Sequence, residues 1–182
     1  DQVIIQGPPG TGKSFLAAQI CTHFLKENKS VCLSALTNNA LKEIAQQQSL
    51  RNSLEKGLVY KTNLSSDEKR KIPSLKPITS ITPIQGELLL STYYQLSKKV
   101  FELIQEGKRY DLLIIEEASQ AFLATIAMFK EIAEKVLIIG DHKQLPPLVL
   151  NREIANEIHE SVDKVIDGLK TFAFNHSEFS YR

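Results

Sequence analysis

Residues 7–14 near the start of the chain have the types and spacing of a phosphate-binding loop. They read Gly-Pro-Pro-Gly-Thr-Gly-Lys-Ser and match the pattern G-x-x-x-x-G-K-[ST]. Glycines let the backbone approach a ligand, and amides at the start of the next helix point at phosphate oxygens. The sequence therefore predicts a site for ATP with Mg²⁺, in which Lys13 reaches the β- and γ-phosphates and Ser14 binds the cation. The predicted nucleotide-contacting residues are Gly7, Pro8, Pro9, Gly10, Thr11, Gly12, Lys13 and Ser14. The alternative is a glycine-rich turn that binds no ligand.

Two adjacent acids, Glu116 and Glu117, directly follow the apolar segment 112–115. A buried strand that ends in two acids is the expected second half of an ATPase site. The first acid would hold Mg²⁺, directly or through water, and the second would orient and deprotonate the attacking water. We therefore expect Glu116 on the metal side and Glu117 as the catalytic base. The alternative is that both acids favour the N-terminus of a helix through its dipole.

A third polar position, Gln144, lies beyond another apolar segment, 136–139. A neutral amide at this point can hydrogen-bond the γ-phosphate or the attacking water and so sense hydrolysis. Pro146 and Pro147 would stiffen the chain that leaves this position. The alternative is an ordinary turn after a strand.

The elements that must position these residues alternate along the chain. Apolar segments predict strands at 3–6, 31–36, 88–92, 112–115 and 136–139, and we expect the first to be buried. Helical patterns begin after residue 14 and cover 38–48, 95–105 and 121–135, with Thr37 or Asn38 as a cap of the second. This alternation predicts an α/β fold, a parallel sheet with helices on both faces and its site at the carboxyl ends of the strands.

Residues 49–86 break this rhythm with a charged run and several prolines, and predict an insertion or long surface loop. Its triplet Lys69-Arg70-Lys71 either is solvated or contacts a polyanion. Residues 151–182 predict a packed helix. We expect residues 1–182 to form one domain of a larger protein.

Composition narrows the class of protein. Of 182 residues, 42% are hydrophobic and 24% charged, as in ordinary globular domains. A net charge of +1 argues against a purely electrostatic nucleic-acid binder. No apolar run approaches the ~20 residues that span a bilayer, so no membrane partner is expected. Cys21 and Cys32 predict reduced, buried thiols and a cytoplasmic, intracellular setting.

The motifs together resemble those of superfamily 1 helicases. Residues 140–147, Gly-Asp-His-Lys-Gln-Leu-Pro-Pro, resemble motif III of the branch that contains the nonsense-mediated-decay RNA helicases and related DNA helicases. Residues 115–120 resemble its motif II, which usually has Asp where this chain has Glu116. Residues 35–41 resemble motif Ia, and residues 90–93 lie where the family has a further strand-end motif. The resemblance covers residues 3–150.

This resemblance implies the first of two RecA-like domains of a P-loop NTPase, which binds and hydrolyses ATP. Lys13, Glu117 and Gln144 would be its catalytic residues, and Ser14 and Glu116 its metal ligands. Single-stranded DNA or RNA would be its track, because hydroxyls and amides suit backbone phosphates. The residues expected to touch that backbone are Thr37, Asn38, Asn39 and Thr92. Tyr93 or Tyr94 either stacks on a base or is structural.

Two parts of the helicase pattern do not occur in this sequence. The adenine-reading glutamine lies upstream of the phosphate loop in the family and is absent here. The second RecA-like domain, with its arginines, is absent too, so we expect the isolated domain to hydrolyse ATP slowly. The competing interpretations are an AAA-type ATPase loader or remodeller and a non-catalytic nucleotide-dependent module. Against the loader, the arginines after Glu117 are Arg152 and Arg182, neither in a recognisable sensor context.

Overall fold

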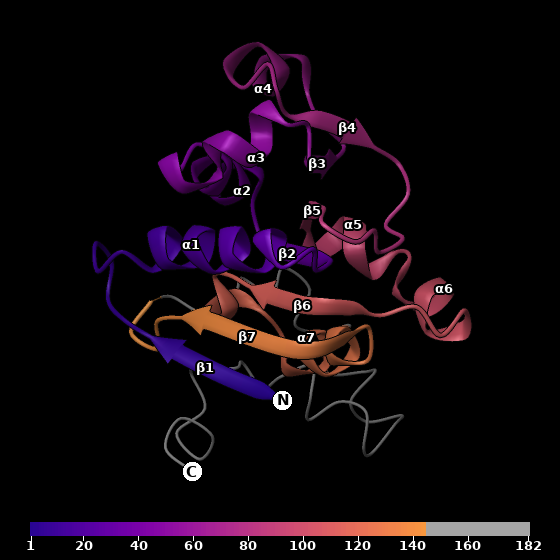
Figure 1. The fold of residues 1–182 in the computed structure, drawn as a ribbon. Helices are drawn as coiled ribbons and strands as arrows, with labels where there is room; N and C mark the ends of the chain where they lie inside the picture. The colour runs from indigo at the N-terminus through magenta and orange to yellow at the C-terminus, as the bar shows by residue number, and fades with distance from the viewer. Residues whose placement is uncertain (145–182) are drawn as a thin grey trace, which may run out of the picture.

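The computed structural model describes residues 1–144, which build a seven-stranded sheet whose described pairings are all parallel (Figure 1). The strand order is β1-β7-β6-β2-β5-β3-β4. The strands are β1 (Gln2–Gln6), β2 (Val31–Ala35), β3 (Val59–Thr62), β4 (Lys76–Ile78), β5 (Leu88–Thr92), β6 (Tyr110–Ile115) and β7 (Ala133–Gly140). Because they are parallel, their carboxyl ends meet at one edge of the sheet, where β1, β6 and β7 point in Figure 1.

Helices pack on both faces of this sheet. They are α1 (Lys13–Lys26), α2 (Asn38–Ala45), α3 (Arg51–Glu55), α4 (Ser66–Lys71), α5 (Tyr93–Ser97), α6 (Val100–Gln105) and α7 (Leu123–Lys130), with 3₁₀ turns η1 (Gln48–Leu50) and η2 (Ala118–Gln120). One core cluster joins α1, α2 and α3 to Leu33 of β2, and the other joins α5, α6 and α7 to Cys32. Successive residues of β2 thus face opposite cores, which confirms the predicted α/β sheet with helices on both faces.

Two of the predicted helices were wrong in extent. The segment 95–105 forms two short helices, α5 and α6, instead of one. The helix predicted over 121–135 ends at Lys130, and Ala133 already begins β7. Ala133 pairs with Tyr110 of β6, whose backbone N–H donates to the Ile132 carbonyl oxygen at 2.8 Å. Long-range pairing therefore overrides the helical pattern of this stretch.

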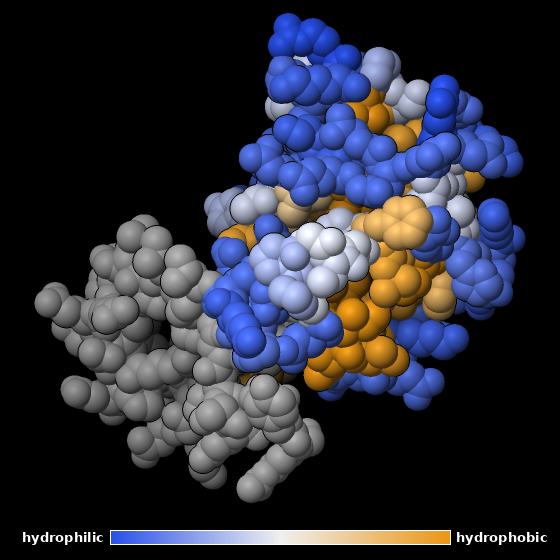
Figure 2. Space-filling view, turned by 90° about the vertical axis from the view of Figure 1, so that its left-hand side faces the viewer, coloured by the Kyte–Doolittle hydropathy of each residue, from blue (hydrophilic) through white to orange (hydrophobic). Residues whose placement is uncertain are grey.

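The prediction that the first strand is buried was wrong. Val3 and Ile4 are each 57% exposed, because β1 is the edge strand of the described sheet and pairs there with β7 alone. Figure 2 shows one face of the molecule, on which hydrophobic residues are exposed among hydrophilic ones. The run of β-branched residues Val3-Ile4-Ile5 therefore indicates strand propensity here and not burial.

The prediction of a long loop at residues 49–86 was also wrong. The segment contains η1, α3, β3, α4 and β4, and β3 pairs with β5 of the main sheet. The charged run forms helix α4, and Ser65 and Glu68 cap its N-terminus with a capping box. The basic triplet lies in its last turn, where the helix dipole favours cations. That this segment is an insertion stays a prediction.

Two further expectations concern the thiols and the chain end. Cys21 and Cys32 are free and buried, as predicted. Pro146, Pro147 and the helix predicted within 151–182 lie outside the described residues. Among the helices of residues 1–144, none combines the length and apolar character required to cross a bilayer.

Candidate nucleotide-binding site

The predicted phosphate-binding loop joins the end of β1 to the start of α1. Gly10 and Gly12 have φ values of 79° and 83°, in the left-handed region where other residues are strained. Gly7 is needed for space, because an added Cβ would lie 2.8 Å from Oγ1 of Thr11. That hydroxyl donates to the Pro8 carbonyl oxygen at 2.8 Å, which stiffens the turn. Gly10 and Gly12 thus have the unusual dihedrals that were predicted, and Gly7 leaves room for the Thr11 side chain of the same loop.

The side chain of Lys13 lies along this loop. Its Nζ donates to the carbonyl oxygens of Gly7 and Pro8 at 2.7 and 2.9 Å. The Gly7 N–H donates to the Gly140 carbonyl oxygen at 3.2 Å, which fastens the loop to the end of β7. The ammonium is thus held at the carboxyl edge of the sheet, where the acids of the site also lie.

A cavity of about 440 Å³ opens beside the loop. Among the predicted site residues, Pro9, Gly10, Gly12, Lys13, Ser14, Glu116, Glu117 and Gln144 line it. The sequence analysis did not predict five other residues of the cavity wall, which come from α1, α2, β7 and the turn after α2. They are Phe15, Ala40, Glu43, Gln47 and Gly140. Ala40, Glu43 and Gln47 recur at intervals of three and four residues, along one side of the buried face of α2, and this spacing could have identified them.

Glu116 reaches Ser14 across the cavity. The Ser14 hydroxyl donates to Oε1 of Glu116 at 3.1 Å, although the two residues come from α1 and from the end of β6. Glu116 is 5% exposed, and burial, followed by the charge of Glu117, raises the pKa of its carboxyl group. The Tyr93 hydroxyl donates to the Glu116 carbonyl oxygen and anchors this backbone from below the site.

Glu117 has a strained backbone. Its φ and ψ of 58° and 33° lie in the left-handed region, which is unusual for a residue other than glycine and typical of functional sites. Burial raises the pKa of its carboxyl group, hydrogen bonds from Thr37 oppose this, and the charge of Glu43 adds to it. Thr37 Oγ1 donates to Glu117 Oε2 at 3.5 Å. The end of β2 therefore touches the acid that follows β6.

Gln144 follows a tight turn after β7. Its N–H donates to the Asp141 carbonyl oxygen at 3.1 Å, and the Lys143 N–H donates to Oδ1 of Asp141 at 3.0 Å. The ring of His142 contacts the Gln6 amide, next to the phosphate-binding loop. This turn brings Gln144 to the cavity wall.

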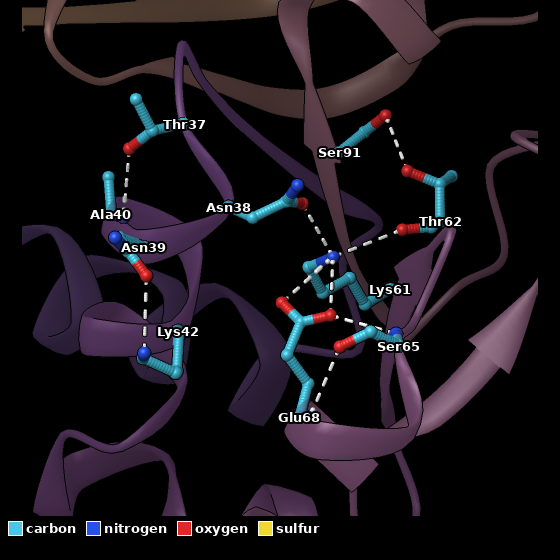
Figure 3. A network of polar contacts seen from close by, with 10 residues as sticks. All are labelled: Thr37, Asn38, Asn39, Ala40, Lys42, Lys61, Thr62, Ser65, Glu68 and Ser91. Atoms are coloured by element: carbon cyan, nitrogen blue, oxygen red, sulfur yellow. Dashed lines mark hydrogen bonds and ion pairs between the residues drawn. The ribbon is translucent and has the colours of Figure 1, made fainter.

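The residues predicted to touch nucleic acid lie at the ends of β2 and β5, which are adjacent, since Ala35 pairs with Thr92. Thr37 caps α2 by accepting from the Ala40 N–H at 3.1 Å, and Thr92 caps α5. Asn38 accepts from Lys61 and Asn39 from Lys42, at 2.8 and 3.2 Å (Figure 3). The structure thus gathers these positions at one edge of the sheet.

The two candidate stacking tyrosines differ in exposure. Tyr93 is 7% exposed and packs in the core, so it is a structural residue. Tyr94 is 67% exposed, and the Lys98 ammonium lies 4.2 Å from its ring centroid. Only Tyr94 of this pair is therefore available to a ligand.

Residues 1–149 match the family described as AAA domain. The DNA replication ATP-dependent helicase/nuclease DNA2 of Saccharomyces cerevisiae is 28% identical over 156 residues, covering 83% of this chain and 10% of that protein. The Schizosaccharomyces pombe protein of that name is 29% identical over 85% of this chain and 11% of its own length. The chain thus spans about a tenth of these relatives.

A solved structure agrees with the fold. The UvsW helicase from bacteriophage T4 superposes with a TM-score of 0.52 at 11% identity, covering 94% of this chain and 52% of that chain. At this identity the likeness concerns the fold alone. The chain belongs to the AAA domain family and is a RecA-like domain of the superfamily 1 helicase type.

Proposed function

We propose that the chain is the ATP-binding and ATP-hydrolysing motor domain of an ATP-dependent helicase or translocase. The observation that carries this proposal is the distance of 3.1 Å between Ser14 Oγ and Glu116 Oε1. It joins the phosphate-binding loop to the acid that follows β6, in a cavity that Lys13 and Glu117 also line. Membership of the family supports the same activity.

The pair Ser14 and Glu116 fits Mg²⁺. Both groups offer oxygen, which this hard cation prefers. Their oxygens lie 3.1 Å apart, so the two side chains would hold the cation together, directly or through water. The longer Glu116 in place of the family's usual Asp still reaches Ser14. When bound, Mg²⁺ would neutralise charge on the β- and γ-phosphates.

The remaining residues take separate roles in the proposed site. Lys13 and the backbone N–H groups of residues 7–14 bind and orient the phosphates. Glu117 accepts the proton of the attacking water, and its raised pKa makes its carboxylate a stronger base. Gln144 positions the γ-phosphate or the water through its amide. Phe15, exposed on the cavity wall, adds an apolar surface beside the nucleotide.

The partners proposed for this domain are a single-stranded nucleic acid and a second RecA-like domain of the same parent protein. Thr37, Asn38, Asn39 and Thr92 form the proposed contact with backbone phosphates. Thr37 also touches Glu117, so one residue adjoins both the nucleic-acid side and the proposed base. DNA is the favoured track, since the relatives are named as DNA replication helicases. The same names give no support to an AAA-type loader.

The test is ATP turnover by the full-length parent protein, with and without single-stranded DNA and RNA. The control variant is Lys13→Ala, which removes the ammonium that the phosphates require. Stimulation by either polymer that the control lacks supports the motor and identifies its track. Turnover that responds to neither polymer would overturn the proposal.

A further inference from the structure

A buried ion pair beneath the proposed nucleic-acid contact carries a further inference. Lys61 of β3 is 0% exposed, and its Nζ lies 3.2 Å from Oε1 of Glu68, which belongs to α4. Both residues come from the segment 49–86, which none of the helicase motifs covers. A buried charge is costly unless it is paired and hydrogen-bonded, so this arrangement calls for an explanation.

The Lys61 ammonium uses all three of its donors. It donates to Oε2 of Glu68 at 3.3 Å, to the Thr62 carbonyl oxygen at 3.3 Å and to Oδ1 of Asn38 at 2.8 Å. Glu68 is fixed in turn by the Ser65 N–H, which donates to Oε2 at 2.9 Å. Burial would raise the pKa of the Glu68 carboxyl group, but the hydrogen bonds from Ser65 and Lys61 outweigh it and the pKa is lowered. Glu68 therefore stays charged and keeps Lys61 in place.

The chemistry of the ammonium decides how Asn38 is oriented. An ammonium group only donates, so the amide atom that faces it must be the oxygen of Asn38. The amide nitrogen then lies on the side away from Lys61, as Figure 3 shows. Asn38 is exposed, and a phosphate oxygen can accept hydrogen bonds from the two N–H groups of its amide.

The same strand also supports the second proposed contact. Thr62, next to Lys61, shares a hydrogen bond of 3.0 Å with Ser91, and Ser91 precedes Thr92 in β5. Both Thr62 and Ser91 are buried. Strand β3 thus holds the end of β5 through Ser91 and the start of α2 through Asn38 (Figure 3).

We propose that Lys61 is a positioning residue for nucleic-acid binding, which turns the Asn38 amide so that its N–H donors face the backbone phosphates of single-stranded DNA. This inference rests on the proposed function. Lys61 is 0% exposed and cannot reach a phosphate itself, so its effect on binding would pass through Asn38. Loss of one such hydrogen bond weakens binding about two- to tenfold.

The test is a double-mutant cycle in the full-length parent protein, with oligo(dT) as the probe. Asn38→Leu removes the amide, and Lys61→Met with Glu68→Gln removes the ion pair without leaving one buried charge alone. The readouts are the oligo(dT) dissociation constant and the oligo(dT) concentration that half-saturates ATP turnover. Lys56→Met is the matched control, because it removes one exposed lysine charge of the same segment, outside this network and outside the triplet Lys69-Arg70-Lys71.

Positioning predicts that both changes weaken oligo(dT) binding about two- to tenfold and that together they weaken it no further than Asn38→Leu alone. Maximal turnover of the Lys61→Met, Glu68→Gln variant at saturating oligo(dT) should persist, and Lys56→Met should bind oligo(dT) like the wild type. Independent, multiplicative losses would overturn the inference, and so would wild-type affinity in Asn38→Leu. If wild-type turnover responds neither to oligo(dT) nor to single-stranded RNA, the proposed function fails instead, and the inference falls with it.

Discussion

Substitution Lys61→Met is predicted to destabilise the fold strongly. Methionine keeps the length of the side chain and removes the ammonium, so the Glu68 carboxylate loses its cation at a position where its side chain is 10% exposed. Asn38 and the Thr62 carbonyl also lose a donor. Breaking a buried pair from one side costs about 3–5 kcal/mol. In a domain of this size we expect a fall in melting temperature of about 6–20 °C.

Circular dichroism during thermal unfolding of this chain measures that fall. The double variant Lys61→Met with Glu68→Gln should recover most of the lost stability, because it leaves no unpaired charge. Lys69→Met should stay within about 2 °C of the wild type, since exposed substitutions change stability little. A melting temperature for Lys61→Met within about 2 °C of the wild type would refute the reasoning, and so would failure of the double variant to recover.

Three further predictions address the proposed base Glu117, the Asp111 carboxylate and the two thiols. Glu117→Gln should lower nucleic-acid-stimulated turnover about 10²- to 10⁴-fold while fluorescent ATP analogues bind as before; unchanged turnover would exclude Glu117 as the base. Asp111 accepts two hydrogen bonds from Ser30, and its carboxyl pKa is lowered from 3.8 to about 2. Its contribution to the free energy of unfolding should therefore be full above pH 3.8 and decline as the pH falls towards about 2. Urea unfolding should show the advantage of the wild type over Asp111→Asn shrinking in that window, and a constant advantage would contradict this. Burial raises the pKa of the Cys21 thiol to about 12 and that of Cys32 further, so a thiol reagent should label both only after denaturation. Rapid labelling of the native chain would contradict the buried placement.

Apolar patterning located the central strands well, because each residue of a parallel strand covered on both faces is buried. It predicted β5 at 88–92 without error and found the cores of β2, β6 and β7. It misjudged β1, since the same residue types also suit an exposed edge strand. It missed α4, although Ser65 and Glu68 have the spacing of a capping box, because the charges around them suggested a loop.

Local chemistry was enough to predict a phosphate-binding loop, since eight adjacent residues carry both the turn and the proposed ligand groups. The acids after β6 could likewise be read as a pair, because a strand end and its neighbours are contiguous in sequence. Their distance from Ser14, the place of Glu43 in the cavity and the partners of Lys61 depend on how separate strands pair. That pairing is cooperative and long-range, so only the folded sheet decides which distant side chains meet.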